Sequence, residues 1–552
     1  MRVRIARFFG LAVLLPATLP LFAQQPAGST GQPLSSVWNA KEPGISLSEG
    51  MLRARLLKSA EESAMPEKDA LSAVSVDSAG KGADSKANPP QDKPHKFGAL
   101  SVFGSWRFRT EAWDWFQPAT GENAYAFSHS LLRVGISQKR ESFEWLLEGA
   151  QDAISGLPGN AVVPGRQGQL GLGGSYFVAN GGGQSNVNGF VKQAYVGLKL
   201  PANGKLRLGR FTFSDGAEVA PQDKTVATLI NTRIAQRLIG DFGFSAVQRS
   251  FDGVQLAFDA GKTNLTLFGA RPTRGVYQVD AMGEVAVDVF YGAYTIPTSF
   301  KSGAGEVRVF ALGYVDERGN VLKTDNRPLA GRTADRNQIR IGTYGADYVH
   351  VSRTADHGQF DFLLWGAVQN GSWGVQSHRA GAFVGEFGWQ PPIRVLNPWF
   401  SAGYSFGSGD SNSSDNRHAT FFQVLPTPRA YARFPFYNME NNEDFYGTAV
   451  FRFAHSLAVR SEVHALRLAN AQDLWYGGGG AFQPRTFGYT GRASGGNRSL
   501  ANIWDVSLDA PLRYGFSITT YFAHAWGKSV VSSIYPAGNQ SPFGYVETNF
   551  RF

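Results

Sequence analysis

The sequence contains no cysteine, and it contains no long apolar run beyond its N-terminal region. The absence of cysteine from 552 residues excludes a disulfide framework, thiolate metal sites and cysteine nucleophiles. No later stretch reaches about 18 consecutive apolar residues, the length that a membrane-spanning helix requires. The sequence therefore excludes a helical membrane protein.

Glycine and aromatic residues are plentiful by contrast. The chain has 65 glycines, aromatic residues make up 13% of it, and its mean hydropathy is slightly negative. A membrane β-barrel places apolar residues at every second position of its strands, so its average hydropathy resembles that of a soluble protein. The composition fits an exported barrel.

The first residues form a secretory signal pattern. Three arginines within the first seven residues precede an apolar run over 8–22, which Ala23 follows. A charged start, a short apolar core and a small residue at the cut predict a cleaved signal peptide over 1–23. The chain is therefore expected to leave the cytoplasm and reach the outer membrane of a Gram-negative-type bacterium.

The next region, 24–97, is rich in Ala, Ser, Lys, Asp and Pro. It holds nine basic and nine acidic residues and so has no net charge. This composition predicts a periplasmic linker that is largely disordered. The alternative is a short helix over 47–65 through which periplasmic export or synthesis proteins would bind.

The third region, 98–552, is predicted to form an all-β, transmembrane, antiparallel up-and-down barrel. Its segments alternate between apolar and polar residues with the period of two that is typical of strands. In the last ten residues Phe550 and Phe552 share one face and Glu547 and Arg551 the other, and an aromatic last residue resembles the assembly signal of outer-membrane barrels. The predicted strands number about 18 and cover 98–115, 125–137, 142–152, 188–199, 205–211, 249–260, 263–271, 286–294, 305–315, 338–353, 359–369, 380–389, 398–406, 444–454, 457–468, 500–510, 515–526 and 543–552.

The connections between these strands support a membrane barrel. Even-numbered strands end at short turns, such as 138–141 and 261–262, whereas most odd-numbered strands end in long loops, such as 153–187 and 407–443. Outer-membrane barrels have short periplasmic turns and long outer loops. A soluble sandwich gives no reason for such a division.

Several motifs resemble the alginate export family of 18-stranded outer-membrane porins. Leu-Gly-Arg ends a strand at 208–210, Arg-Leu-Ile-Gly follows at 237–240, and Phe-Asp-Gly begins the next strand at 251–253. Ser-Gly-Asp at 408–410 is a further match. The stretches 422–426, 148–152 and 193–195 match as well. The resemblance implies a passive channel for alginate-like anionic polysaccharide or related anionic solutes, with no enzymatic activity. Phe211 in place of a family glutamine and the long loop 212–248 depart from the pattern and leave the identity of the solute in doubt.

The alternation also predicts which side chains face the lumen. If apolar residues face lipid, arginines that lie between them face inward. The predicted pore-lining residues are Arg107, Arg109, Arg133, Arg207, Arg249, Arg340, Arg452, Arg460 and Glu462. An electropositive lumen would conduct anions, because a ring of charge selects by sign and arginine binds carboxylates in a bidentate manner. The alternative is that these arginines pair with acidic residues and only rigidify the barrel.

Other functions stay open at this stage. A general diffusion porin for small solutes has the same barrel signature, as does a purely structural barrel. An outer-membrane hydrolase would need a Ser/His pair, and His524 shares the lipid face with Trp526 without a matching serine motif. The nine histidines show no spacing typical of metal ligands, and His464 is interpreted as a polar luminal residue. No catalytic residue, metal, cofactor or nucleic-acid partner is expected. The barrel is expected to be surrounded by outer-membrane lipid.

Two further expectations concern loops and aromatic residues. Residues 153–187 contain ten glycines, which favour a loop that folds back into the lumen. Trp113, Trp115, Trp389 and Trp526 lie near strand ends and are expected in the aromatic girdles at the membrane interfaces.

Overall fold

The computed structural model describes residues 95–427, 433–434, 438–453, 456–477 and 490–552. The predicted signal peptide, the linker up to residue 94 and the alternative helix over 47–65 lie outside the described residues. Everything described below belongs to the second of two compact units, Val74–Phe552.

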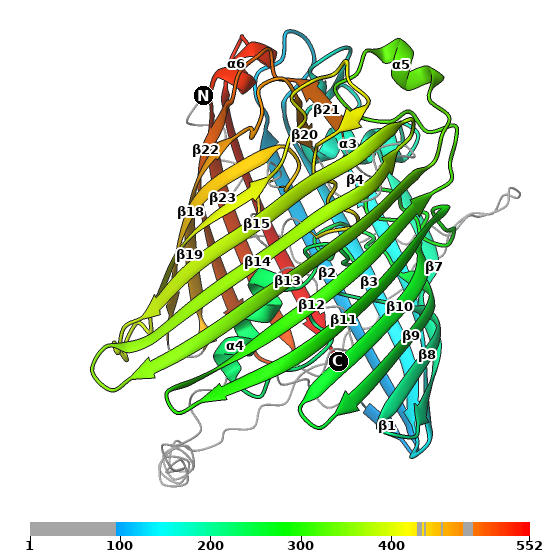
Figure 1. Cartoon of the computed structure of the whole chain (residues 1–552), viewed down its shortest axis with the longest axis vertical. Helices are drawn as coiled ribbons and strands as arrows, with labels where there is room; N and C mark the ends of the chain where they lie inside the picture. The colour runs from blue at the N-terminus through cyan, green and yellow to red at the C-terminus, as the bar shows by residue number, and fades with distance from the viewer. Residues whose placement is uncertain (1–94, 428–432, 435–437, 454–455, 478–489) are drawn as a thin grey trace, which may run out of the picture. The chain divides into compact units, whose positions relative to one another are not determined.

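Eighteen strands within the described residues form one closed antiparallel barrel (Figure 1). Each strand pairs with its neighbour in the chain, and the last strand pairs with the first from Phe543–Trp113 to Arg551–Ser105. The strands are β2 (Leu100–Asp114), β3 (Ala124–Lys139), β4 (Phe143–Ser155), β7 (Asn186–Leu200), β8 (Gly204–Phe211), β9 (Phe251–Ala260), β10 (Thr263–Pro272), β11 (Val287–Phe300), β12 (Gly303–Asp316), β13 (Ile339–Thr354), β14 (Gly358–Trp373), β15 (Gln376–Gln390), β16 (Trp399–Gly407), β18 (Asn442–Arg452), β19 (Ala458–Arg467), β22 (Ser499–Pro511), β23 (Phe516–Gly527) and β24 (Gln540–Arg551). The prediction of an 18-stranded barrel is confirmed.

The remaining elements are short. They are β1 (His95–Phe97), which pairs with β2, together with β5 (Val162–Val163), β6 (Gly168–Gln169), α3 (Gly171–Ala179), α4 (Lys224–Leu229), the π-helical turn η1 (Ile230–Ile234), α5 (Leu329–Ala334), β17 (Arg417–His418), β20 (Leu474–Gly477), β21 (Thr490–Ala493) and α6 (Ser529–Ile534). None of the helices in the described part of the chain is long and apolar enough to cross a membrane.

The two ends of the barrel differ in their connections. At one end, turns such as 201–203, 261–262 and 301–302 join the strands, and at the other end most connections are long loops. One expectation fails at the long-loop end: β14 and β15 run on to Trp373 and Gln376, so only two residues join them. Long cross-strand pairing replaces the longer loop that was expected there.

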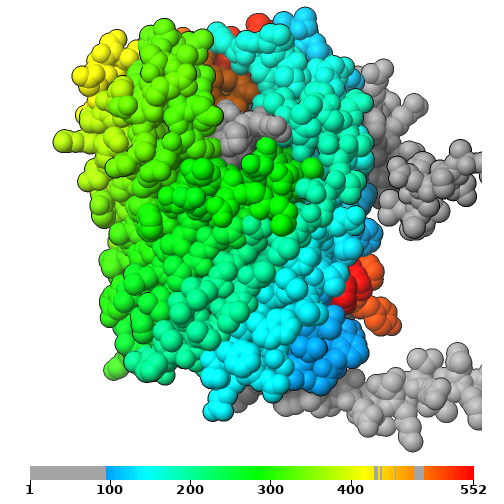
Figure 2. All heavy atoms as spheres, turned by 90° about the vertical axis from the view of Figure 1, so that its right-hand side faces the viewer, coloured from blue at the N-terminus to red at the C-terminus, as the bar shows by residue number. Residues whose placement is uncertain are grey.

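The outer surface of the wall is apolar and the inner surface is polar. On β2, Trp106 and Phe108 are exposed on the outside, whereas Arg107, Arg109 and Glu111 are buried on the inside. Figure 2 shows one face of the barrel as a continuous wall of side chains over the strands coloured from cyan to green. Strict alternation therefore places charged side chains in the lumen, where other parts of the protein cover them.

The parts that cover them are loops from the long-loop end. The largest insertion joins β8 to β9 over residues 212–250, and we call it the inserted loop. Its helix α4 packs against β12 and β13 near the short-turn end (Figure 1). Every residue from Arg237 to Ser250 is buried. The loop therefore runs through the lumen towards the opposite mouth.

Candidate functional site

The lumen brings together most of the predicted arginines, but it uses them in different ways. Arg109, Arg133 and Arg460 are paired with carboxylates of the barrel wall. Arg133 on β3 holds Glu148 on β4 through two hydrogen bonds of 2.8 and 2.9 Å. Arg109 is fully buried and its Nε lies 2.7 Å from Glu547 on β24. The Arg133 and Arg109 pairs each join two neighbouring strands. They support the alternative in which the arginines pair with acidic residues and rigidify the barrel.

Arg460 pairs with the other predicted residue, Glu462. Both lie on the inner face of β19, and the guanidinium of Arg460 donates to Glu462 Oε1. The same oxygen accepts from Thr448 Oγ1 at 2.9 Å. Arg233 of η1 lies 3.4 Å from it and 3.5 Å from Glu386 on β15. This acidic side of the wall thus holds the inserted loop by its arginine.

Arg107 on β2 also holds the inserted loop. Its guanidinium donates to the backbone carbonyls of Gly243, Ser245 and Ala246. Arg109 adds a bond of 2.8 Å to the carbonyl of Phe244. The two arginines therefore serve as donors to the loop backbone, a use that strand periodicity alone does not reveal.

Arg249 lies at the end of the inserted loop, because β9 begins two residues later than predicted. It is fully buried, and its carbonyl accepts from Lys192 Nζ at 2.7 Å. Lys192 was not predicted as a luminal residue. The pairing of β4 with β7 shifts register at Glu148 and Gly149, which buries both Lys192 and Gln193 and breaks the alternation that would have marked the lysine.

The prediction for Arg340 is wrong. Ile339 and Ile341 are buried inside the barrel, and Arg340 points outward, where it hydrogen-bonds Gln338 at 2.9 Å. The prediction assumed that apolar neighbours face lipid. Here the inserted segments fill the lumen with apolar side chains, so the apolar face of this strand end is the inner one.

Arg207, Arg452 and Arg551 form a third group at the short-turn mouth, which we call the mouth arginines. Arg207 lies over the Tyr195 ring at 4.6 Å, and Arg452 lies over Trp399 at 5.2 Å. Within the described residues no carboxylate lies within 4 Å of any of the three guanidinium groups, and all three are partly or fully exposed. Arg551 was not among the predicted site residues, although it alternates with the buried Glu547.

The inserted loop is also held by buried charges at β12. Arg308 on β12 is 1% exposed and lies 2.6 Å from Asp347 on β13 and 3.4 Å from Glu218 of the loop. Nearer the mouth, Asp223 of the loop pairs with Arg353 at 2.6 Å. Strict alternation with Val307 and Val309 marks Arg308 as inward-facing, so sequence reasoning could have found it.

Two acidic groups of the inserted loop have shifted pKa values. Burial raises the pKa of Asp215 to about 7, against the opposing charge of Arg308. Burial also raises the pKa of Asp241, which faces Lys192. Asp215 accepts hydrogen bonds from the backbone amides of Leu238 and Ile239 at 3.0 and 2.8 Å, which closes the loop upon itself.

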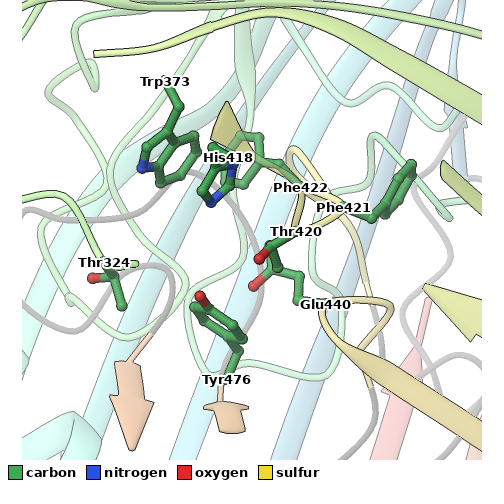
Figure 3. Close-up of a pocket in the computed structure, with 8 residues that line it drawn as sticks. All are labelled: Thr324, Trp373, His418, Thr420, Phe421, Phe422, Glu440 and Tyr476. Carbon is green, nitrogen blue, oxygen red and sulfur yellow. The ribbon is translucent and has the colours of Figure 1, made fainter. Parts of the chain in front are cut away.

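A second loop joins β16 to β18, and its residues 420–427, 433–434 and 438–441 are buried in the lumen. Its Leu425 pairs in parallel with Ile239 of the inserted loop. Phe421 and Phe422 are buried there, and Phe422 lies beside the ring of Trp373 (Figure 3). The cavity that these residues line measures only about 10 Å³, which is about the volume needed for one water molecule. This level of the lumen is packed.

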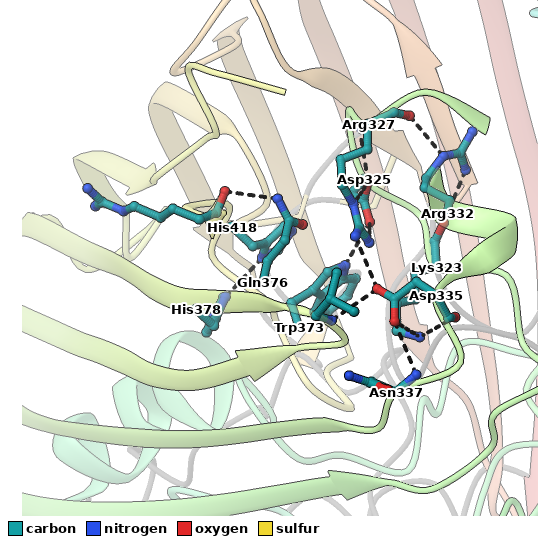
Figure 4. Close-up of polar contacts among 12 residues, drawn as sticks. Lys323, Asp325, Arg327, Arg332, Asp335, Asn337, Trp373, Gln376, His378 and His418 are labelled. Carbon is teal, nitrogen blue, oxygen red and sulfur yellow. Dashed lines mark hydrogen bonds and ion pairs between the residues drawn. The ribbon is translucent and has the colours of Figure 1, made fainter. Parts of the chain in front are cut away.

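Above it, the loop 317–338 forms an ion cluster at the outer mouth (Figure 4). Arg327 lies 2.8 Å from Asp325 and 3.1 Å from Asp335. Trp373 Nε1 donates to Asp325 at 2.9 Å, and Lys323 pairs with Asp335 at 3.4 Å. The cluster fastens this loop to the ends of β14 and β15.

The glycine-rich loop 153–187 also enters the barrel, though less deeply than the inserted loop. Tyr176 of α3 is fully buried against the luminal ring of Phe127, and its hydroxyl accepts from the amide of Ala246. Two tryptophans depart from expectation in the same region: Trp113 and Trp115 are buried inside, with Trp113 stacked on Phe543 at 3.9 Å. They line the lumen and do not belong to the outer girdle.

Comparison with known proteins identifies the fold and the family. The alginate export family model matches residues 188–514. The chain belongs to the alginate export family. OccAB2 of Acinetobacter baumannii superimposes with a TM-score of 0.53 at 10% identity, covering 83% of this chain and 99% of that protein. OpdK of Pseudomonas aeruginosa gives a TM-score of 0.47 at 9% identity, over 82% and 99% of the two chains.

No curated protein sequence matches this alginate export family member. Its membership in the family and its closed 18-stranded barrel place it among outer-membrane channels. Outer-membrane barrels have short turns on the periplasmic side. The mouth arginines therefore lie at the periplasmic mouth, and the ion cluster of Figure 4 lies at the outer one.

Proposed function

We propose that this alginate export family member is a gated channel for an anionic polysaccharide, with the mouth arginines as its first contact. The observation that carries the proposal is that Arg207, Arg452 and Arg551 face the lumen without a carboxylate partner among the described residues. Their planar groups are free to bind a carboxylate in bidentate fashion. A polyuronate presents one carboxylate per sugar, and several weak contacts would hold the chain while allowing it to move on.

The packed interior favours a gated channel over a permanently open diffusion porin. Residues from Arg237 to Ser250 are buried throughout, and Leu425 of the second loop pairs with Ile239 among them. A polymer cannot pass unless the inserted loop moves. Arg107 and Arg109, which bind the backbone of the inserted loop, hold the closed state and would meet the solute only after that loop is displaced.

Planar-bilayer recording of the full-length mature protein tests the proposal. We expect anion preference, and we expect block by long polyuronates at a lower carboxylate concentration than by uronate monomers. Polymer on the periplasmic side should block more strongly than polymer on the outer side. Replacing Arg207 and Arg452 by Gln should weaken both block and anion preference, whereas the outward Arg340→Gln should leave both unchanged. Cation preference, or equal block by monomers, would reject the proposal in favour of a general diffusion porin.

The N-terminal regions enter the proposal as export and tethering elements. We infer that residues 1–23 are removed on export and that 24–97 remain in the periplasm, where they contact an export or synthesis protein. N-terminal sequencing of protein purified from outer membranes should begin close to Gln24. A chain that still begins at Met1 would contradict the signal assignment, and export without residues 47–65 at the normal rate would contradict the partner contact.

A further inference from the structure

Three potential metal ligands meet on the inner wall where β19 pairs with β22. Glu462 and His464 are two residues apart on β19, so both face the lumen. Asp505 on β22 lies directly opposite Glu462 in the antiparallel register. One ligand atom of each of the three side chains lies within 4.8 Å of the others, and all three residues are buried.

Each of the three side chains is anchored by another group. His464 Nδ1 is hydrogen-bonded to Asp444 Oδ2 at 2.8 Å. Glu462 Oε1 accepts from Thr448, Arg460 and Arg233. Asp505 Oδ2 accepts from the Tyr521 hydroxyl at 3.0 Å. These bonds fix the orientation of every side chain from outside the cluster.

Two of the remaining polar atoms of the cluster have no hydrogen-bond partner. They are His464 Nε2 and Glu462 Oε2, and both are buried. The exposed fraction is 5% for His464 and 1% for Glu462. A buried polar atom without a partner is unfavourable, because it has lost its hydrogen bonds to water. A histidine and two carboxylates that are each held by a hydrogen bond from outside, with an unpaired atom on the histidine and on one carboxylate, have the arrangement of a metal site and its supporting shell.

We propose that Glu462, His464 and Asp505 bind one divalent transition-metal ion of the zinc class. A histidine ligand favours zinc, copper or nickel over calcium and magnesium, which prefer oxygen ligands alone. Two carboxylates balance the charge of the ion, and the hydrogen bond that His464 Nδ1 donates to Asp444 fixes the histidine tautomer that leaves Nε2 free. Ligand atoms that are each about 2.0–2.2 Å from a tetrahedral zinc ion lie about 3.3–3.6 Å apart, so atoms that now lie within 4.8 Å of one another approach by up to about 1.5 Å when the ion binds.

The rival occupant is a proton on His464 Nε2. A charged imidazole between Asp444, Glu462 and Asp505 would form an ion cluster with the same geometry. Arg460 and Arg233 also lie beside Glu462, and their charge opposes a cation. Both arginines, however, bind the Oε1 atom, which leaves Oε2 without a hydrogen bond.

Metal titration of the purified full-length mature protein separates the two occupants. The protein should carry no polyhistidine tag and be treated with chelator first. Co²⁺ should give one equivalent of visible ligand-field absorption, which Zn²⁺ then displaces. Absence of this band at millimolar Co²⁺ would overturn the proposal and assign the proton to the cluster.

Variants locate the ion. His464→Gln and Asp505→Asn should each weaken Zn²⁺ binding at least tenfold, and Asp444→Asn should weaken it about 10–100-fold through loss of orientation. His524→Gln, on the outer face, is the matched control and should bind as the unchanged protein does. Heat-modifiable mobility on gels checks that each barrel is folded. His378 and His418 form a second buried pair at 2.9 Å, so loss of the band in His418→Gln but not in His464→Gln would overturn the assignment.

Discussion

The charge cluster at Arg308 offers a direct way to open the channel. Its guanidinium is the countercharge of Asp347 on the wall and Glu218 on the inserted loop, with almost no solvent exposure. Arg308→Gln removes that countercharge and leaves two carboxylates buried while the loop is docked. When the loop leaves, water enters the lumen and hydrates them. The cost of the substitution therefore falls on the closed state alone.

The expected size of the effect follows from this burial. Removing one partner of a buried ion pair costs about 3–5 kcal/mol, and each 1.4 kcal/mol is a tenfold change in an equilibrium. Arg308→Gln should raise the ratio of open to closed channels by about two to four orders of magnitude. Single-channel recording measures this ratio, and trypsin should cut the released loop after Lys224 or Arg233.

A matched exposed pair and a double variant test the reasoning. Arg271 pairs with Asp288 at 2.6 Å, but the arginine side chain is 48% exposed, and an exposed pair contributes about 0–1 kcal/mol. Arg271→Gln should leave gating unchanged. Adding Glu218→Gln to Arg308→Gln should restore part of the closed population. If Arg308→Gln gates and resists trypsin as the unchanged protein does, the loop is not held by these charges.

Three further predictions concern the pH dependence of gating, a glycine in the barrel wall and the glycine-rich loop. The pKa of Asp215 is about 7 when the inserted loop is docked, above about 3.9 for a free aspartate. Docking of the loop is therefore strongest below pH 4 and weakens as the pH rises to 7. Channels should open more often at pH 7.5 than at pH 5, and Asp215→Asn should reduce that difference. Gly371 has φ 141°, and a Cβ there would lie 2.0 Å from the carbonyl oxygen of Arg340. Gly371→Ala should therefore lower the free energy of unfolding of the barrel by about 1–3 kcal/mol, as measured by urea unfolding. Gly366→Ala on the same strand should leave it unchanged. Deleting 160–183 should raise conductance only modestly, because the inserted loop stays; a full opening would contradict the central role of that loop.

Sequence periodicity was sufficient for the wall of the barrel. Each strand has one face in lipid, so a period of two specifies its position and register. The eighteen predicted segments match the eighteen strands one for one, and their ends agree to within four residues except at β11, which runs six residues past the predicted 294 to Phe300. The closing contact of β24 with β2 follows from the even count. Nothing beyond alternation and turn lengths was needed for this part of the fold.

The content of the lumen could not be obtained in the same way. Alternation says that a residue faces inward, but it does not say what it meets there. Arg107 meets loop carbonyls and Arg133 meets Glu148, whereas Arg207 meets aromatic rings. Arg340 shows the converse failure, because a plugged lumen can be as apolar as lipid. Distinguishing these cases requires the path of the inserted loop.

The sequence did contain a signal for that path, but glycine content was the wrong criterion. A loop that stays in water has no reason to be apolar, yet the inserted loop carries a row of aliphatic and aromatic side chains that are all buried: Val226, Leu229, Ile230, Ile234, Leu238, Ile239, Phe242 and Phe244. Apolar content and length together mark the segment that must find an interior. The loop length that set this chain apart in its resemblance to the family is, on this account, the length needed to reach from the outer rim to the periplasmic mouth.

Because the inserted loop extends through the lumen, it contacts both basic and acidic side chains of the barrel wall. Arg107, Arg109 and Lys192 bind the loop backbone on one side, while Glu386 and Glu462 bind its Arg233 on the other. A loop held by basic groups on β2 and β7 and by acidic groups on β15 and β19 can be released by a polyanion, which competes for the basic groups and repels the acidic ones. Under the proposed function, the solute itself thus opens its path, and the conductance should rise before it is blocked as polyuronate is added from the periplasmic side.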